Sequence, residues 1–180
     1  MEAKLQTARY NLVSIEDEDQ DFIFEGLSHP DVIPFYGVSY HTIEETKQQM
    51  EFYQNLEKKD EGYWWKIVSR ESGQKQGAIG FNNYQSQHKK AEIGYWLLPK
   101  FWKQGIIAEV FPVLIQYLFD IKQLHRIEAL VESGNISSDK VLLQAGFIYE
   151  GLLRDYELKQ GKFISLNMYS LLQRDIKYNT

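Results

Sequence analysis

Apolar residues alternate with polar ones in seven stretches of the chain, and this period of two predicts β-strands. The stretches cover residues 9–15, 62–70, 75–85, 89–99, 125–132, 148–158 and 163–172. Polar turn sequences, "ESGQ" at residues 71–74 and "KQGK" at residues 159–162, join two neighbouring pairs of them. The pattern therefore predicts a sheet of about seven strands that includes two hairpins.

Other stretches of the chain predict helices. The acidic segment "EDEDQDFIFEGL" leads into a first helix that ends near Gly26. Thr42 and Glu45 form a capping box, which predicts a helix of about 15 residues reaching roughly Lys58. Asn135 is a good helix cap, and Gly146 ends the short helix that follows it.

A further helix is predicted from Gly105 to about Ile121. Its apolar residues share one helical face: Ile107, Val110, Leu114, Leu118 and Ile121. Pro112 lies inside and removes the hydrogen bond to the carbonyl of Ala108, so we expect a kink or a short distortion within one helix.

The start of this helix has no Ser, Thr, Asp or Asn between Lys100 and Ala108 that could cap it. Water can satisfy the free amides, in which case Gly105 merely allows a turn. Alternatively, the amides hold an anion such as phosphate, and the glycine lets the anion approach closely. The residues of this segment leave both interpretations open.

Composition narrows the class of protein. The 180 residues fit one domain, residues 1–180, and the order βααβββαβαββ indicates an α/β (α+β) fold. The chain has no cysteine, and its four histidines show no metal-ligand spacing, so we expect no metal site. A net charge of -5 argues against general nucleic-acid binding. With no hydrophobic signal core and no apolar run of about 20 residues, a cytoplasmic protein without membrane contact is expected.

The order of elements, with "WKQGIIAE" after the fourth strand and "NISSDKVLLQAGFIYEG" after the fifth, resembles the GNAT superfamily of acetyl-CoA-dependent N-acetyltransferases. The closer likeness is to the RimJ/RimL group, which acetylates the N-termini of ribosomal proteins. The segments "HPDV", "TIEET", "AEIGYWL" and "YSLL" extend the likeness over nearly the whole chain. It implies a GNAT fold, a mixed, mostly antiparallel twisted sheet flanked by about four helices, and acetyl-CoA as cosubstrate.

The resemblance implies that the amides of one loop hold the CoA pyrophosphate. The family pattern is Gln or Arg, two residues, Gly, one residue, then Gly or Ala, and Trp102, Gly105 and Ile107 occupy its positions here. Ile107 stands where a small residue is usual. The cofactor-binding amides implied are those of Lys103, Gln104, Gly105, Ile106, Ile107 and Ala108.

Other site residues are also implied by the resemblance. Alternation places Glu92 on one strand face with Gly94, where a bulge or a close backbone approach is expected, and the family uses a Glu here as general base. A carboxylate paired with Lys89 or Lys90 is the plainer alternative for Glu92. The backbone groups of Leu97 and Leu98 are expected to bind pantetheine as an added strand would.

Two polar residues at the start of the helix after Asn135 have a structural and a functional interpretation each. Asn135 is a helix cap or a ligand of the pantetheine arm, and Ser138 is a solvated hydroxyl or a group that stabilises the leaving thiolate. Some GNAT branches carry a tyrosine general acid four residues after Ser138, where this chain has Leu142. Ser138, Tyr149 or water must then return the proton.

The acceptor is the least defined partner. We expect a primary amine, most simply the N-terminus of a protein, with a polyamine or an aminoglycoside as the alternative substrate and a non-catalytic acetyl-CoA-binding module as the alternative class. The six carboxylates of "EDEDQDFIFE" either attract an amine or form a solvated helix face. Ser165 stands where the group commonly has Asp. Since dimers are frequent in the group, the resemblance also carries a homodimer as an expectation.

Overall fold

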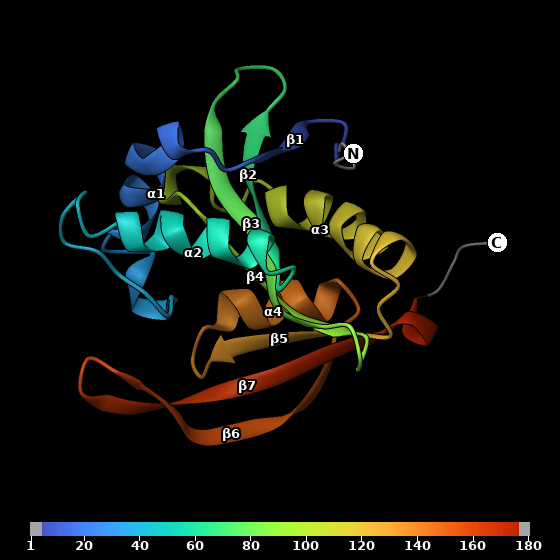
Figure 1. The fold of residues 1–180 in the computed structure, drawn as a ribbon. Helices are drawn as coiled ribbons and strands as arrows, with labels where there is room; N and C mark the ends of the chain where they lie inside the picture. Colours follow the sequence, from blue (N-terminus) through green and yellow to red (C-terminus); the bar gives the residue numbers. More distant parts are fainter. Residues whose placement is uncertain (1–4, 177–180) are drawn as a thin grey trace.

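In the computed structural model, which describes residues 5–176, seven strands form one sheet (Figure 1). The strands are β1 Tyr10–Ser14, β2 Tyr63–Ser69, β3 Lys75–Gln85, β4 Lys90–Leu97, β5 Arg126–Glu132, β6 Ile148–Lys159 and β7 Lys162–Leu172. Their order across the sheet is β1-β2-β3-β4-β5-β7-β6, and every neighbouring pair is antiparallel except β4 and β5. The mixed, mostly antiparallel sheet is confirmed.

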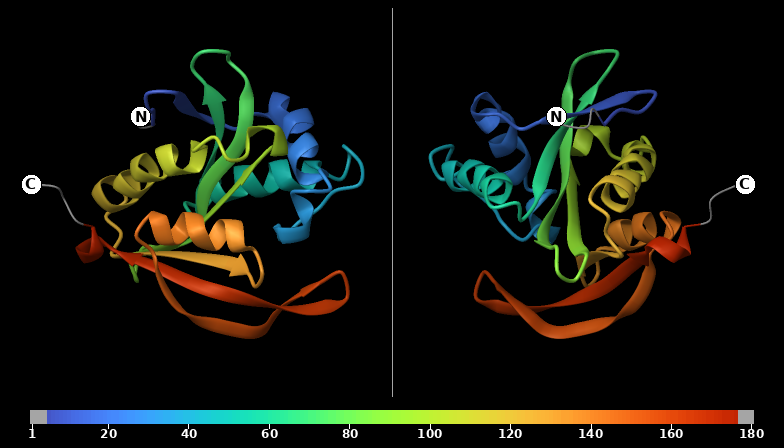
Figure 2. Two further views of the ribbon diagram at one scale, coloured as in Figure 1. Left: turned by 180° about the vertical axis from the view of Figure 1, so that it is seen from behind. Right: turned by 45° about the vertical axis from the view of Figure 1, so that its right-hand side comes forward.

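Four α-helices complete the predicted order βααβββαβαββ. They are α1 Gln20–Leu27, α2 Lys47–Lys58, α3 Ile106–Gln116 and α4 Ile136–Gln144. The two pairs cover opposite faces of the sheet, α1 and α2 on one face and α3 and α4 on the other (Figure 2). No helix in the range that the structure describes has the length and apolar character needed to cross a membrane.

Strand β4 lies at the centre of both cores. Its residues Ala91 and Ile93 pack with α3 and α4, while Trp96 at the opposite parity packs with α1 and α2. Because successive side chains of a strand point to opposite faces, Glu92 shares the α1/α2 face with Trp96. Beyond β5 the β6–β7 hairpin bows away from the helices (Figure 1).

Helix α2 begins at Lys47 with Thr46 as its N-cap, four residues later than the capping box at Thr42 predicted. Thr42 and Glu45 do make the expected kind of contact, since the Glu45 N–H donates to Thr42 Oγ1 at 3.3 Å. The bonds that follow, from Thr46 to Ile43 and from Lys47 to Glu44, span three residues instead of four. The capping box therefore caps a tight turn that precedes the helix.

Helix α3 remains one element across Pro112, and a π-helical turn at Tyr117–Ile121 follows it. Val110, Leu114 and Leu118 are fully buried as predicted, but Ile121 is 64% exposed. A π turn contains more residues than an α turn, so it rotates the residues after it away from the face that the earlier spacing defines. The prediction for Ile121 was therefore wrong.

Candidate active site

The parallel pair β4 and β5 separates after three residues. The paired residues are Lys90 with Arg126, Ala91 with Ile127 and Glu92 with Glu128. The rest of β4 pairs only with β3, and the rest of β5 only with β7. The two strands therefore open into a wedge in the middle of the sheet, with Glu92 at its apex.

The wedge leaves backbone groups of β4 facing it. The Leu98 N–H donates to Gln76 O at 2.9 Å, toward β3, so alternation directs the N–H of Leu97 into the wedge. The Leu98 carbonyl accepts from the Phe101 N–H, and the Leu97 carbonyl accepts from the Trp102 indole at 2.8 Å. Both backbone groups of Leu98 thus have protein partners, so of these two residues it is Leu97 that keeps an N–H able to bind an extended chain.

The start of α3 lies just after this end of β4. Gly105 occupies its N-cap position with a φ of 72°, Lys103 has a φ of 61°, and no side chain caps the helix. The first hydrogen bond of the helix runs from the Glu109 N–H to Gly105 O at 3.1 Å. Within the described residues, the amides of residues 103–108 have no acceptor, and left-handed residues that alternate with right-handed ones point successive N–H groups to one concave side.

Arg9 holds this loop from the other end of the chain. Its Nη1 and Nη2 atoms donate to Gln104 O at 3.3 and 3.2 Å, and its Nε pairs with Glu109 Oε2 at 2.5 Å. Ile107 does not crowd the amides, because its side chain is buried in the core beside α3. No pattern in the sequence indicated Arg9, because it contacts the loop across about a hundred residues of the chain.

The Glu92 side chain is half-buried at the apex of the wedge. Burial raises the pKa of its carboxyl, and the nearby Glu128 and Glu157 raise it further, while a 2.9 Å hydrogen bond from Asn83 Nδ2 and the charge of Lys90 act in the opposite direction. Lys90 itself pairs with Glu128 at 3.2 Å. The alternative of a surface ion pair between Glu92 and Lys89 or Lys90 is therefore wrong.

Gly94 does not form the expected bulge, since β3 and β4 pair in regular register on both sides of it. A Cβ atom at this position would meet the Trp64 ring at 2.8 Å. The glycine therefore allows a close approach by an aromatic side chain, which covers the strand between Glu92 and Trp96.

Ser138 lies in the first turn of α4. Its N–H donates to the Asn135 side chain at 3.2 Å, which confirms the cap, and its Oγ lies 2.6 Å from the Tyr95 hydroxyl of β4. Burial raises the pKa of Tyr95 to about 12, so this hydroxyl stays protonated at neutral pH. Leu142 is fully buried, and Tyr149 packs against Tyr169 at the sheet edge. Tyr95 was missed because core packing alone explains an aromatic residue on β4.

Comparisons with known proteins match this geometry to a family. A model described as an acetyltransferase (GNAT) domain matches residues 9–148. The chain is also 34% identical over 170 residues to the Bacillus subtilis (strain 168) protein called uncharacterized N-acetyltransferase YoaA, which covers 94% of this chain and 96% of that protein. The chain belongs to the GNAT acetyltransferase family.

Further relatives indicate the branch. The ribosomal-protein-serine acetyltransferase of Escherichia coli (strain K12) is 35% identical over 94 residues, 52% of each chain. The solved structure of RimL, a ribosomal L7/L12 alpha-N-protein acetyltransferase in complex with coenzyme A, superposes with a TM-score of 0.84 at 20% identity, covering 94% of this chain and 98% of that one. This GNAT enzyme is an N-acetyltransferase that resembles the RimJ/RimL group.

A second solved structure represents a different acceptor. The spermidine N-acetyltransferase from Vibrio cholerae, in complex with CoA and spermine, superposes with a TM-score of 0.81 at 18% identity, covering 92% of this chain and 96% of that one. RimL and the spermidine N-acetyltransferase were both solved with CoA bound. Two features of the present chain fit a CoA molecule. The uncapped amides of residues 103–108 suit a diphosphate, and the Leu97 N–H suits an amide chain laid along β4.

The acidic residues 16–25 were expected either to attract an amine or to form a solvated helix face, and one of them does neither. Asp19 is fully buried and pairs with Lys66 and Lys75, each at 2.5 Å. The remaining carboxylates of the segment lie nearer the surface. Asp19 therefore ties the start of α1 to strands β2 and β3 and is not available to an acceptor.

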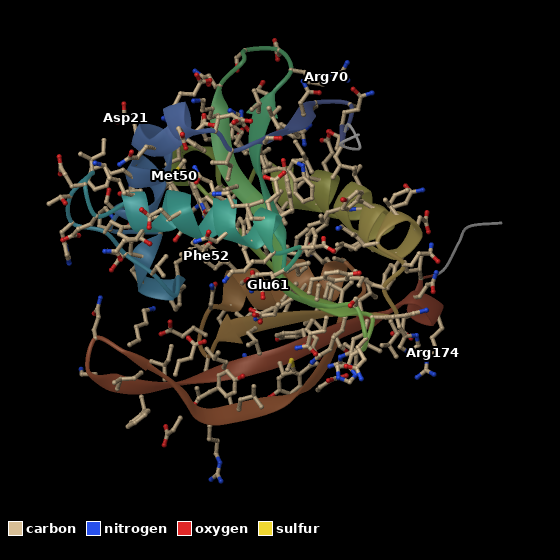
Figure 3. The ribbon with its side chains drawn as sticks, in the orientation of Figure 1. Asp21, Met50, Phe52, Glu61, Arg70 and Arg174 are labelled. Atoms are coloured by element: carbon tan, nitrogen blue, oxygen red, sulfur yellow. The ribbon has the colours of Figure 1, made fainter. Side chains whose placement is uncertain are left out.

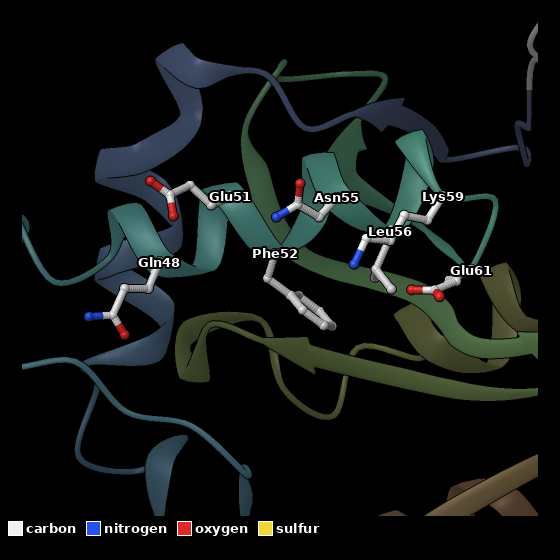
Figure 4. Close-up of a pocket in the computed structure, with 7 residues that line it drawn as sticks. All are labelled: Gln48, Glu51, Phe52, Asn55, Leu56, Lys59 and Glu61. Atoms are coloured by element: carbon white, nitrogen blue, oxygen red, sulfur yellow. The ribbon is translucent and has the colours of Figure 1, made fainter.

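A hollow of about 340 Å³ lies on the outer side of α2 (Figure 4). Its lining includes Glu51 and Phe52 of α2 and Glu61 of the loop between α2 and β2, and Phe52 and Glu61 are labelled in Figure 3. None of the predicted site residues lines it. In the described part of the chain, no group of three or more His, Asp or Glu residues has the arrangement of a metal site.

Proposed function

We propose that this GNAT enzyme transfers the acetyl group of acetyl-CoA to the N-terminal amine of a protein, in the manner of the ribosomal-protein acetyltransferases. The observation that carries the proposal is the wedge between β4 and β5, which has a half-buried carboxylate at its apex and uncapped amides beside its mouth. The names of the Escherichia coli relative and of RimL support the acceptor. A cytoplasmic location, where such acceptors are made, belongs to the same proposal.

The residues divide the chemistry between the two faces of the sheet. Glu92, on the α1/α2 face, accepts the proton of the attacking amine, directly or through water. The amides of Lys103, Gln104, Gly105, Ile106, Ile107 and Ala108 hold the diphosphate, with the Leu97 N–H and Asn135 on the pantetheine. Ser138, on the α3/α4 face, donates a hydrogen bond to sulfur as negative charge develops there, and the nucleophile attacks the thioester without an acyl-enzyme.

Replacement of Glu92 by Gln tests the general base. The variant keeps the shape of the side chain, so we expect acetyl-CoA affinity to be unchanged while kcat/KM at pH 7 falls by about 10² to 10⁴. A loss of less than threefold at pH 7 contradicts the role, and so does a deficit that is equal at pH 7 and pH 9.5. The base matters less at high pH because the free amine is then abundant.

Release of the CoA thiol with a panel of amines identifies the acceptor. Short peptides with free N-termini are expected to react faster than spermidine or an aminoglycoside, each assayed against its N-acetylated form as a control. The spermidine N-acetyltransferase that superposes on this chain makes a small polyamine the second candidate. An α-amine has a pKa of about 8 and an alkylamine one of about 10.4, so the Glu92→Gln deficit should disappear at lower pH with the α-amine.

A further inference from the structure

We propose that Asn83 is a positioning residue that holds the Glu92 carboxylate, and that the bulge in β3 exists at this point to bring the Asn83 side chain to it. The inference rests on the function proposed for Glu92. It starts from the register between β3 and β4, where Asn82 pairs with Glu92 and Gln85 pairs with Lys90. Asn83 and Tyr84 therefore stand opposite the single residue Ala91, which is a β-bulge.

The bulge reverses the parity of the strand. Regular alternation from Phe81 would put Asn83 on the α3/α4 face and Tyr84 on the face of Glu92. Instead, Tyr84 packs edge-on against Phe81 with ring centroids 6.4 Å apart, on the α3/α4 side. Asn83, with a φ of 53°, turns to the other face and donates from Nδ2 to Glu92 Oε2 at 2.9 Å.

The residue type fits both demands of the position. Asparagine adopts the left-handed region at lower cost than most other residues with a side chain. Its amide also supplies an N–H donor, whereas aspartate, which tolerates the same backbone, would place a second negative charge against Glu92. The Tyr84 N–H bonds to Glu61 O at 2.9 Å, so the bulge is anchored to the loop before β2 as well. Asn83 is thus held between two backbone contacts, the pairing of Asn82 with Glu92 and the hydrogen bond from Tyr84 to Glu61.

Removal of the donor should change the protonation of Glu92. The other groups that act on Glu92 are Glu128 of β5, Glu157 of β6 and Lys90 of β4. A hydrogen bond to the ionised form lowers the pKa of a carboxyl, so its loss raises the pKa, and a carboxylate in its place raises the pKa further. Since the base must be ionised, the acid limb of kcat/KM then moves to higher pH.

The experiment uses three variants. Asn83→Gly keeps the left-handed backbone and removes the amide, and Asn83→Asp keeps the shape and replaces the donor by a carboxylate. The control is Asn82→Ala, which removes the same type of side chain from the residue paired directly with Glu92, where the amide makes no hydrogen bond to the Glu92 carboxyl. We expect the acid limb to rise by about half a unit in Asn83→Gly and by about one unit or more in Asn83→Asp, with no rise in Asn82→Ala, because a smaller side chain there exposes Glu92 to water and does not bury it further.

A second measurement keeps the inference separate from the proposed function. The pKa of the Glu92 carboxyl is followed by carbon NMR in the full chain without substrate, with the Glu92→Gln variant assigning the resonance. An unchanged Glu92 pKa in Asn83→Gly and Asn83→Asp overturns the positioning role, whatever the activity. If the Glu92 pKa shifts in the Asn83 variants while Glu92→Gln keeps normal turnover, the positioning of Glu92 by Asn83 stands. The general-base role proposed for Glu92 is then refuted.

Discussion

Helices α3 and α4 pack side by side on the same face of the sheet, yet their N-termini are built in opposite ways. α4 begins at Asn135, whose side chain accepts the Ser138 N–H. α3 begins at Gly105, which has no side chain to offer. A capped helix start has satisfied its own donors, whereas an uncapped one leaves them available to water or to a ligand. We propose that the difference separates a mainly structural start from a binding one.

The uncapped start is nevertheless held in shape. Arg9 contacts both Gln104 and Glu109, one residue before and four residues after Gly105. Hydrogen bonds from Thr7 and Arg9 to the Glu109 carboxylate outweigh its partial burial and lower its pKa, so the contact is present at neutral pH. A loop fixed before its ligand arrives loses less conformational entropy on binding. The contacts of Arg9 therefore organise the loop before α3 within the protein itself.

The largest effect is expected when the uncapped start receives a charge. Gly105→Asp places a carboxylate among the amides proposed to hold the diphosphate, and we expect acetyl-CoA affinity to fall at least tenfold, about 1.4 kcal/mol. Gly105→Asn is the matched control, because it has the same shape and tolerates the φ of 72° without the charge. Calorimetry that gives wild-type affinity for Gly105→Asp would remove the distinction between the two helices.

The sequence predicted most of what is local in this comparison. The missing cap of α3, the Asn135 cap of α4 and the glycine that ends α4 all follow from short-range residue preferences, and the structure contains each. Thr42 and Glu45 misled because the same hydrogen bonds that begin a helix also close a turn. The mixed character of the sheet followed from the family likeness, since a parallel pair such as β4 and β5 leaves no mark in the alternation of residues.

The parts of the site that the sequence did not predict depend on contacts between distant segments. Arg9 reaches the loop before α3, Tyr95 of β4 meets Ser138 of α4, and Asp19 is paired by lysines of β2 and β3. Asn83 reached Glu92 only because a bulge changed the parity of β3, and no period-two pattern records a bulge inside a continuous strand. Site geometry is therefore set by tertiary partners that single-residue preferences do not contain.

A smaller effect is expected at the capped start. Asn135→Ala removes the acceptor of the Ser138 N–H, and loss of an N-cap typically costs about 1 kcal/mol of unfolding free energy. Asn135→Ser restores a cap without the amide. Denaturation should show Asn135→Ser to be nearly as stable as the wild type, and a persistent loss of acetyl-CoA affinity in that variant would indicate that Asn135 also binds the pantetheine. If Asn135→Ala is as stable as the wild type, α4 is not held by its cap.

The smallest effect concerns the one group of the capped start that we assign to chemistry. Ser138 Oγ and the Tyr95 hydroxyl lie 2.6 Å apart, and either hydroxyl can donate. When Tyr95 donates, the Ser138 proton is free to point at developing charge on sulfur. Loss of an interaction made only in the transition state lowers kcat without changing acetyl-CoA affinity.

We expect Ser138→Ala to lower kcat about threefold to fivefold, the loss of one net hydrogen bond. Ser137→Ala, one residue away and exposed, should leave kcat unchanged. Because Tyr95 is proposed to act through Ser138, adding Tyr95→Phe to the Ser138→Ala variant should lower kcat little further. Equal kcat in Ser138→Ala and Ser137→Ala would make the start of α4 structural throughout and leave the thiolate to be protonated by water.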